Sequence, residues 1–283
     1  MRIINSLSEM QHYVQEQKKQ GLSIGFVPTM GYLHEGHLQL MDAAREENDL
    51  LVASIFVNPL QFGPNEDFEQ YPRDEEEDIR KARERGVDVL FFPHVHDMYP
   101  SSLSIVMKVE RRADVLCGRS REGHFDGVVT VLAKLFHLVQ PNKAYFGNKD
   151  AQQVAVVDAL IEDYNFPIEL RALNTVREKD GLAKSSRNVY LSKEEREEAP
   201  YIYEALHYGK RRLQEEHVSS RQVKDEVSRF ITSHTRGKID YVDILSYPQL
   251  ERVEEYSGQI IIAAAVYFSK ARLIDNIIFE VRS

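Results

Sequence analysis

The chain has 283 residues, of which 42% are hydrophobic and 29% charged, a balance typical of a globular protein with one large domain or two smaller ones. A net charge of −9 argues against a broad nucleic-acid-binding surface, and a single cysteine excludes an internal disulfide and a cysteine-rich zinc site. No apolar run approaches the roughly 20 residues of a membrane span and the start has no signal-peptide core, so we expect a cytoplasmic protein with no membrane partner.

The first two-thirds of the chain alternates between strand-like and helix-like segments. Apolar runs predict strands at residues 23–29, 50–57, 87–93, 143–148 and 168–175, with a further candidate at 104–110. Helices are predicted between them at 36–46, 74–85, 127–139 and 150–164. Strands that alternate with helices indicate βαβ units, and strands that are apolar throughout suit a parallel sheet covered on both faces. We therefore predict an α/β fold for this part.

The pattern changes after about residue 176. Two charged helical segments are predicted at 193–214 and 220–234, and three strand-like runs follow at 238–246, 259–268 and 272–281. Grouped helices followed by grouped strands are typical of a small α+β domain. We place the boundary at residue 176, so that residues 1–176 form the larger domain and residues 177–283 the smaller one.

Four unusual clusters each follow a predicted strand. They are PTMGYLHEGH (28–37), NPLQFG (58–63), FGNKDAQQ (146–153) and TVREKDGLAKSSRN (175–188). In an open parallel sheet, ligands bind beyond the carboxyl ends of the strands. We therefore expect these four clusters, although distant in sequence, to converge on one crevice.

The first cluster combines two histidines with two glycines at the start of a predicted helix. Gly31 and Gly36 allow the backbone to approach a ligand, and the helix N-terminus offers free N–H groups and the positive end of its dipole. His34 and His37 are three residues apart and share a helix face. Imidazoles at that position can donate hydrogen bonds to a phosphate, an interpretation that we favour over a surface turn and over a metal-binding pair.

The other clusters also suit a phosphorylated ligand, although each has an ordinary loop or helix-cap interpretation as well. In FGNKDAQQ, Lys149 supplies an ammonium group, Asp150 can cap the next helix or accept from a hydroxyl, and Gln153 lies one turn further on. Residues 184–187 concentrate two cations and two hydroxyls in one loop. Gln61 lies among apolar side chains, as suits a small ligand with both hydroxyl and methyl groups.

Three weaker features are interpreted as structural. The acidic run PRDEEED is interpreted as the solvated face of a helix, with magnesium contact by Glu77 or Asp78 as the alternative. Cys117 is interpreted as a partly buried thiol rather than a nucleophile. His94 and His96 are interpreted as part of a polar loop rather than as metal ligands.

Two of the clusters resemble the HIGH and KMSKS signatures of the nucleotidyltransferase superfamily, which bind ATP and assist attack at its α-phosphorus. HEGH (34–37) matches the first, and AKSSR (183–187) matches the second without its leading lysine. Taken in order, VPTMGYLHEGH, FVNPLQFG, YPRD, YFGNKDAQQ and DGLAKSSRN extend the resemblance over nearly the whole chain, to the pantothenate synthetase (pantoate–β-alanine ligase) family. The pairing of PTMGxLHEGH with FGxKDxQQ is specific, whereas HxGH alone is weak.

This resemblance implies a Rossmann-like N-terminal domain, a smaller C-terminal domain that acts as a lid, and a homodimer. It implies that His37 is the catalytic proton donor, and we count His34 and Lys149 with it as catalytic residues that offset phosphate charge. Gln61 and Gln153 would hold pantoate, and Gln61 would also hold β-alanine. The residues implied to bind ATP are Met30, Gly31, Tyr32, Leu33, His34, Glu35, Gly36, His37, Gly147, Asn148, Lys149, Asp150, Val176, Lys184, Ser185, Ser186 and Arg187.

The implied reaction is the ATP-dependent condensation of (R)-pantoate with β-alanine through a pantoyl adenylate, with Mg²⁺ carried by ATP and with AMP and pyrophosphate released. It is the last step of pantothenate biosynthesis. Three other interpretations are a nucleotidyltransferase that releases the nucleotide conjugate, a relative of tRNA synthetases, and a nucleotide-sensing module without catalysis. The acidic charge counts against the tRNA synthetase interpretation. Release of AMP and pyrophosphate from ATP and pantoate, with and without β-alanine, distinguishes them.

Overall fold

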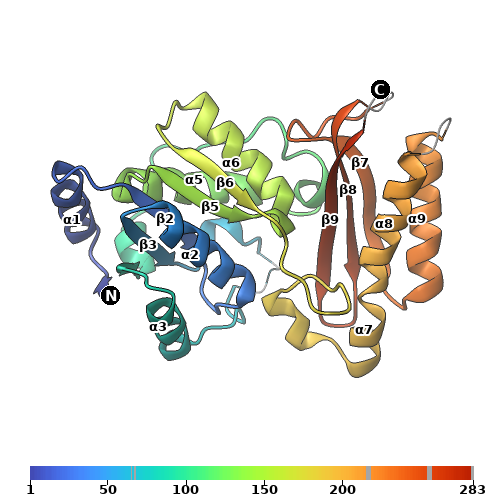
Figure 1. Cartoon of the computed structure of the whole chain (residues 1–283), viewed down its shortest axis with the longest axis horizontal. Coiled ribbons are helices and arrows are strands. Elements are labelled where there is room, and N and C mark those ends of the chain that lie inside the picture. The colour runs from blue at the N-terminus through green and yellow to red at the C-terminus, as the bar shows by residue number, and fades with distance from the viewer. Residues whose placement is uncertain (65, 67, 215–217, 254–256, 282–283) are drawn as a thin grey trace. The chain divides into compact units, whose positions relative to one another are not determined.

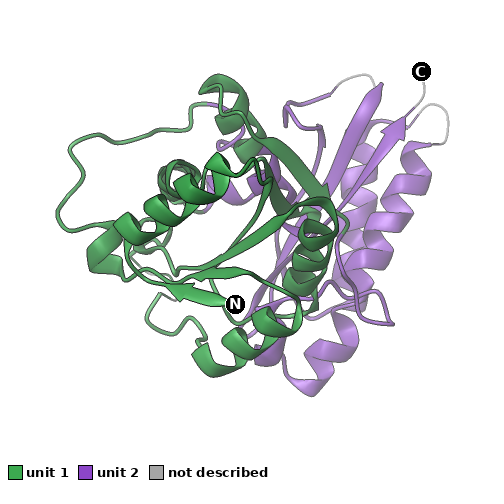
Figure 2. Cartoon of the chain, turned by 60° about the vertical axis from the view of Figure 1, so that its left-hand side comes forward, with its two compact units in different colours: residues 1–110, 121–148, 156–174 green, residues 111–120, 149–155, 175–283 purple. Residues whose placement is uncertain are grey.

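The computed structural model describes residues 1–64, 66, 68–214, 218–253 and 257–281. The chain divides into two compact units (Figure 2). Unit 1 comprises residues 1–110, 121–148 and 156–174, and unit 2 comprises residues 111–120, 149–155 and 175–283. Two short segments from the first part of the sequence, 111–120 and 149–155, therefore group with the C-terminal part.

Unit 1 is built on a parallel sheet in which six strands of the described chain follow the order β1-β4-β3-β2-β5-β6 (Figure 1). The strands are β1 (Arg2–Ile4), β2 (Ile24–Thr29), β3 (Leu50–Ile55), β4 (Val89–Phe91), β5 (Lys143–Gly147) and β6 (Glu169–Leu173). The central strands β2 and β3 are buried along almost their whole length, as expected for strands covered on both faces. The predicted Rossmann-like α/β architecture is confirmed.

Helices follow the strands in the first 174 residues. They are α1 (Leu7–Lys19), α2 (Glu35–Glu47), α3 (Glu75–Glu84), α4 (Val95–Met98), α5 (His124–Val139) and α6 (Ala151–Asp163), with 3-10 turns η1 (Pro59–Gln61), η2 (Leu116–Arg119) and η3 (Asn148–Asp150). Helix α2 contacts β2, β3 and β5, and α5 is buried over most of its length. None of the helices formed by the described residues combines the length and the apolar character that spanning a membrane requires.

The strand order reverses beside β2. From β2 the chain moves outward to β3 and β4, and it then returns to place β5 on the other side of β2, with β6 beyond it. In doubly wound sheets, ligands bind at such a reversal, outside the carboxyl ends of the strands. The loops that follow β2 and β5 therefore occupy the position that a ligand site needs.

Unit 2 contains, among its described residues, an antiparallel sheet of three strands in the order β7-β8-β9. The strands are β7 (Lys238–Ser246), β8 (Gly258–Tyr267) and β9 (Arg272–Val281). Helices α8 (Tyr201–Leu213) and α9 (Ser220–His234) pack against each other and against the sheet. Their approach is close, since a Cβ on Gly209 of α8 would lie 2.7 Å from the Val227 side chain of α9. The predicted smaller α+β part is confirmed.

Two predictions of secondary structure are wrong. Residues 193–214, predicted as one helix, form α7 (Lys193–Glu198) and α8. Pro200 separates them, because a proline has no N–H to donate to the preceding turn. Residues 104–110, a candidate strand, lie outside every strand that the structure describes, and Ile105 and Val106 are 81% and 75% exposed. An apolar run of this kind needs a neighbouring strand, and it has none among the described residues.

Candidate functional site

The loops that follow β2, β3 and β5 carry the predicted site residues of unit 1. Met30 follows β2 directly, Gln61 ends the η1 turn that comes after β3, and Gly147 is the last residue of β5. Because these strands are parallel, their carboxyl ends lie at one edge of the sheet. The structure therefore brings the first two clusters and the start of the third to the same edge.

The backbone turns sharply at Gly31 and Tyr32, just after β2. Their φ angles are +83° and +52°, so two consecutive residues occupy the left-handed region that favours glycine. The Gly31 N–H donates to Thr29 Oγ1 at 3.1 Å, and the Thr29 hydroxyl donates to the Ser54 carbonyl of β3 at 2.8 Å. A Cβ at position 31 would lie only 2.9 Å from an Asp78 carboxylate oxygen. The loop's own fold therefore requires Gly31.

His34 and His37 begin helix α2 and cap it reciprocally. His34 Nδ1 accepts a hydrogen bond from the Gly36 N–H at 3.1 Å, and His37 Nδ1 accepts one from the His34 N–H at 3.3 Å. The two rings lie 4.1 Å apart between their centroids. Because each Nδ1 is an acceptor, the neutral rings carry their protons on Nε2. Two Nε2–H donors therefore lie together at the positive end of the α2 dipole.

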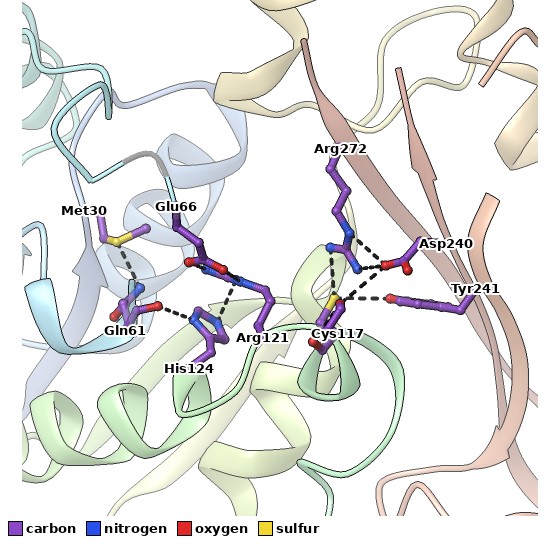
Figure 3. A network of polar contacts seen from close by, with 10 residues as sticks. Met30, Gln61, Glu66, Cys117, Arg121, His124, Asp240, Tyr241 and Arg272 are labelled. Carbon is purple, nitrogen blue, oxygen red and sulfur yellow. Dashed lines mark hydrogen bonds and ion pairs between the residues drawn. The ribbon is translucent and has the colours of Figure 1, made fainter. Parts of the chain in front are cut away.

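Gln61 is buried, and its side-chain amide is oriented by neighbours within unit 1. Asn58 Nδ2 donates to Gln61 Oε1 at 3.1 Å, and Gln61 Nε2 lies 3.1 Å from Met30 Sδ (Figure 3). The Tyr99 hydroxyl donates to Asn58 Oδ1 at 3.0 Å, so the orientation of the Asn58 amide is also set. The Gln61 amide is thus held in one orientation by the protein itself.

His124, at the start of α5, supports the Gln61 backbone (Figure 3). Its Nδ1 donates to the Gln61 carbonyl at 2.7 Å, and its Nε2 lies 3.0 Å from an Arg121 guanidinium nitrogen. Both carboxylate oxygens of Glu66 bind Arg121 at 2.7 Å. Burial acts to raise the pKa of Glu66, but the Arg121 guanidinium outweighs burial and lowers it. We did not predict a role for His124, because nothing in its local sequence connects it with Gln61.

Unit 2 carries the second half of the FGNKDAQQ cluster. The Lys149 ammonium lies 3.7 Å from the Asp150 carboxylate, and the Lys149 carbonyl accepts a hydrogen bond from Asn276 of β9 at 3.0 Å. The two following glutamines differ in burial. Gln152 is 6% exposed and binds the backbone of residues 112–117, whereas Gln153 is half-buried. Gln152 therefore stabilises the fold, and Gln153 is the more exposed of the two side chains.

The predicted phosphate-binding residues 184–187 belong to a compact turn in unit 2. The Lys184 N–H donates to the Val176 carbonyl at 2.9 Å, and the Lys184 ammonium lies 2.8 Å from the Glu178 carboxylate. Ser185 Oγ accepts from the Arg187 N–H at 3.2 Å and so caps the turn η4 (Ser186–Tyr190). Val176 and Lys184, both of which the family resemblance implies to bind ATP, are therefore neighbours.

Cys117 lies in a separate polar cluster of unit 2 (Figure 3). It is 8% exposed, and its Sγ lies 3.2 Å from the Tyr241 hydroxyl and 3.5 Å from Arg272. Arg272 also pairs with Asp240 at 2.7 Å. Burial, together with the neighbouring Cys117, raises the pKa of the Tyr241 hydroxyl. The predicted burial of the Cys117 thiol is confirmed.

The acidic run at the start of α3 is only in part the solvated helix face that we predicted. Glu77 pairs with Arg80 at 2.6 Å, and this contact lowers the pKa of Glu77 to about 2. The prediction is wrong for Asp78, which is 2% exposed. Successive helix residues point in different directions, so the run could not face solvent throughout. Within the described residues, no three His, Cys, Asp or Glu side chains are grouped to hold a metal ion.

The whole chain is similar to one family of known proteins. A sequence model described as Pantoate-beta-alanine ligase matches residues 2–278. The pantothenate synthetase of Geobacillus sp. (strain WCH70) is 58% identical over 281 residues, which cover 99% of this chain and 100% of that protein. The pantothenate synthetase of Bacillus subtilis (strain 168) is 58% identical over 282 residues, which cover 100% and 98% of the two chains.

Solved structures give the same result for the fold. The crystal structure of pantothenate synthetase from Thermus thermophilus superposes with a TM-score of 0.91 at 44% identity, and the match covers 98% of this chain and 99% of that one. The crystal structure of pantoate-beta-alanine ligase from Francisella tularensis, complexed with beta-gamma ATP and beta-alanine, superposes with a TM-score of 0.79 at 34% identity. That match covers 98% and 97% of the two chains.

Proposed function

We propose a reaction for this chain, which belongs to the pantoate–β-alanine ligase family: the ATP-dependent condensation of (R)-pantoate with β-alanine to pantothenate, the last step of pantothenate biosynthesis. The reaction passes through pantoyl adenylate and releases pyrophosphate and AMP. The observation that carries the proposal is the pair of histidine Nε2–H donors at the N-terminus of α2, at the carboxyl edge of the sheet and beside its strand-order reversal. In a member of this family, that position suits the phosphates of ATP.

In this proposal ATP binds residues from the first, third and fourth clusters. The surroundings of Gly147 support this assignment, because a Cβ at this position would meet no described heavy atom within 4 Å beyond its chain neighbours. The fold itself therefore leaves room at Gly147, as the close approach of a ligand requires. The ATP-binding residues would be Met30 to His37, Gly147 to Asp150, Val176 and Lys184 to Arg187.

Pantoate would be held by Gln61 and Gln153, and β-alanine also by Gln61. Pantoate presents a carboxylate, two hydroxyls and two methyl groups, and a buried, pre-oriented amide can distinguish its polar groups. The contacts of Gln61 with Asn58 and Met30 support this role, since they fix the amide before binding and so reduce the entropy lost on binding. Met30 also offers the apolar surface that the methyl groups need.

In the first step, a pantoate carboxylate oxygen attacks the α-phosphorus of ATP, the bond from that phosphorus to the bridging oxygen breaks, and pyrophosphate leaves with the electron pair. Lys149, Lys184 and Arg187 offset the charge that moves onto the leaving group, and the Nε2–H groups of His34 and His37 donate hydrogen bonds to it, His37 from the proton-donor position that the family resemblance implies. In the second step, the amine of β-alanine attacks the anhydride carbonyl, loses a proton and expels AMP. Holding the amine beside the anhydride supplies proximity.

Mg²⁺ enters this proposal with ATP and neutralises part of the phosphate charge. Its preferred ligands are oxygens, and it commonly keeps several waters while it binds substrate phosphates. An ion carried in this way needs few ligands from the protein. Magnesium contact by Glu77 or Asp78 stays a hypothesis.

We also propose a location, an oligomeric state and a domain division for the enzyme. It works in the cytoplasm as a homodimer. Residues 1–176 form the larger domain, and residues 177–283 act as a lid. The resemblance to the family supports these assignments. Light scattering of the purified protein measures the oligomeric state directly, and a monomer at micromolar concentration contradicts the homodimer.

The experiment that tests the reaction measures AMP and pyrophosphate with ATP and pantoate, with and without β-alanine. We expect steady release of both products, and formation of pantothenate, only when β-alanine is present. Pyrophosphate release with a nucleotide conjugate as the final product would support a nucleotidyltransferase instead. Nucleotide binding without any pyrophosphate would support a sensing module, and aminoacylation of tRNA would support a tRNA synthetase relative.

The order of the two steps has its own test. If pantoyl adenylate forms first, a rapid-quench experiment without β-alanine gives about one equivalent of pyrophosphate and bound adenylate per site, with little turnover, because a closed site protects the anhydride from water. Addition of β-alanine then discharges the adenylate to pantothenate and AMP. If no pyrophosphate forms until β-alanine is added, and no positional isotope exchange occurs in ATP, a concerted ternary reaction replaces the two-step mechanism.

A further inference from the structure

Two oppositely charged side chains of helix α3 hold the backbone just before the histidine pair. Asp78 Oδ2 accepts a hydrogen bond from the Tyr32 N–H at 2.7 Å, and Asp78 Oδ1 accepts one from the Leu33 N–H at 2.6 Å. Lys81, one helical turn further along, donates to the Leu33 carbonyl at 2.6 Å. The N–H of Leu33 is thus bound by an anion and its C=O by a cation, and both come from one face of α3.

This arrangement determines the conformation of the loop. Tyr32 has a φ of +52°, a region that is unfavourable for a residue with a Cβ. Hydrogen bonds to a charged acceptor are stronger than ordinary ones, so the two bonds to Asp78 can outweigh the cost of one left-handed residue. The Asp78 carboxylate in turn depends on the loop. It is 2% exposed, and a buried carboxylate without hydrogen-bond donors would lower the stability of the fold. The close contact with Asp78 is also the reason why residue 31 is a glycine.

The held residues lie directly beside the groups assigned to the reaction. Leu33 precedes His34, which is the N-cap residue of α2 and whose ring centroid lies 4.1 Å from that of His37. A rotation of the 32–33 backbone would move the His34 N–H, to which His37 Nδ1 is bonded. The orientation of both imidazoles therefore depends on the Asp78 contact.

We propose that Asp78, assisted by Lys81, is a positioning residue for adenylate formation: it fixes the backbone of residues 31–33 so that the His34 and His37 rings are placed for the phosphates. The inference rests on the proposed function. It assigns Asp78 no contact with substrate. Asp78→Asn replaces one acceptor oxygen by an NH₂ group that faces an N–H donor, so one hydrogen bond is lost and the loop can move.

The main test compares Asp78→Asn with a matched variant in the full-length protein. We expect Asp78→Asn to lower the rate of pantoate-dependent exchange between ATP and pyrophosphate by roughly 10- to 100-fold, with little change in the KM for pantoate. Glu84→Gln makes the same chemical change on the same helix, at an exposed residue paired with Arg80, and should leave the rate unchanged. If Asp78 only stabilises the fold, the loss of rate matches the loss of folded protein, so the exchange rate per folded molecule, with the folded fraction measured by circular dichroism, equals that of the wild type.

A second pair of variants keeps the test valid if Asp78→Asn folds poorly. Lys81→Gln retains an N–H donor for the Leu33 carbonyl and should keep most of the activity, whereas Lys81→Leu removes the donor and should lower the exchange rate severalfold. Hydrogen exchange gives a reading that does not depend on activity. The amides of Tyr32 and Leu33 should lose protection in Asp78→Asn, while the amides of the central strands β2 and β3 keep theirs.

The outcomes separate this inference from the proposed function. If the wild-type protein shows no pantoate-dependent exchange, the proposed function is overturned, and the inference falls with it. If the wild type is active and the Asp78→Asn variant has the same exchange rate, only the inference is overturned. The same holds if the Lys81→Leu and Lys81→Gln variants have equal exchange rates. Recovery of the Asp78→Asn rate at high Mg²⁺ would also overturn it, because Asp78 would then act on the metal ion rather than on the loop.

Discussion

Two backbone segments are held in similar ways by side chains of opposite charge. They are residues 30–37 in unit 1 and residues 176–187 in unit 2. Each segment turns at a glycine with positive φ, which is +83° at Gly31 and +94° at Gly181. In the first segment the Asp78 carboxylate accepts from backbone N–H groups, and in the second the Arg177 guanidinium donates to the Gly181 carbonyl at 3.0 Å. A charged side chain with little solvent exposure therefore holds an unusual backbone conformation in both, since Asp78 is 2% exposed and the Arg177 side chain 16%.

The two charges differ in how they are compensated. Arg177 binds both carboxylate oxygens of Asp275, at 2.7 and 2.9 Å, and its guanidinium lies 3.5 Å from the centroid of the Tyr203 ring. Asp78 instead receives two backbone N–H groups. Arg177 is thus compensated by a carboxylate that lies outside the segment, whereas Asp78 is satisfied by the loop itself.

The two segments differ in where their held residues end relative to the proposed ligand-binding residues. In unit 1 the held residues end at Leu33, directly before His34, so the histidines are placed in advance. In unit 2 the buried part of the segment ends at Leu182 and Ala183, and the next residue, Lys184, binds Glu178 through its side chain. We infer that the first segment is preorganised and that the second closes on the nucleotide.

The largest effect should follow from breaking the anchor in unit 2. Arg177→Met leaves the Asp275 carboxylate, whose side chain is 6% exposed, without its cation, and we expect the free energy of unfolding to fall by about 3–5 kcal/mol. Urea denaturation measures it. Arg196→Gln removes an exposed pair with Asp180 and should cost less than about 1 kcal/mol. Equal losses in the two variants would show that burial of the Arg177 pair does not matter.

The residues that we propose to be catalytic should matter next. We expect His37→Ala and Lys149→Ala each to raise the barrier to adenylate formation by about 3 kcal/mol, roughly 100-fold in rate, because in the proposed mechanism each removes a donor or a charge that acts on the leaving group. Pyrophosphate release with pantoate measures the rate. His37→Ala also removes a helix cap and should cost about 1 kcal/mol of stability. A variant that releases pyrophosphate at the wild-type rate excludes that residue from the mechanism.

Gln61→Ala should separate pantoate binding from nucleotide binding. We expect the KM for pantoate to rise on the order of tenfold or more, since the variant removes a buried, oriented amide. ATP affinity should persist, because Gln61 lies in a different loop from the residues assigned to ATP. Steady-state kinetics with each substrate varied in turn give both values. A collapse of ATP affinity with unchanged pantoate affinity would reverse the assignment of the two subsites.

Hydrogen exchange tests the difference between the two segments directly. On addition of ATP, we expect residues 184–187 to gain protection on the order of tenfold, which corresponds to about 1.4 kcal/mol. Residues 31–33 should change little, because Asp78 and Lys81 already hold them. Full protection of residues 184–187 without nucleotide would contradict a closing segment.

The smallest effect concerns the contact that occupies Lys184. Glu178→Gln removes the carboxylate 2.8 Å from the Lys184 ammonium, so Lys184 no longer has to exchange this partner for a phosphate. We expect the KM for ATP to fall by about two- to fivefold, the range of a partly exposed ion pair. Glu197→Gln, at an exposed residue of α7, is the control. An increase in the KM for ATP would mean that Glu178 assists nucleotide binding.

Much of the fold could be predicted because its signals are local. The apolar runs that became β2, β3 and β5 alternate with helix-like segments, and that alternation already indicates a parallel sheet. Several of the predicted clusters lie at strand ends, and a parallel sheet brings such ends together at one edge. They are residues 28–37, residues 58–63 and the start of 146–153. The break at Pro200 could also have been found, since a proline in the interior of a helix removes a backbone hydrogen bond and clashes with the preceding turn.

Contacts between residues far apart in sequence could not be predicted. Asp78 and Tyr32 are separated by 46 positions, His124 and Gln61 by 63, and Arg177 and Asp275 by 98. Each involves a common residue type whose neighbours give no indication of a partner. The run DEEED shows the consequence, because its acids look alike in sequence and only the packing of α3 buries Asp78.

The sequence by itself determined the alternation of elements, the residues at the strand ends and the family, because periodicity and motif spacing are properties of neighbouring residues. Only the tertiary structure decided which acid is buried, which imidazole nitrogen of His34 and His37 carries the proton, and which of the paired glutamines, Gln152 or Gln153, stays partly exposed. Burial and hydrogen-bond partners depend on what the fold brings together, and side chains of one type acquire different chemistry when the fold gives them different neighbours.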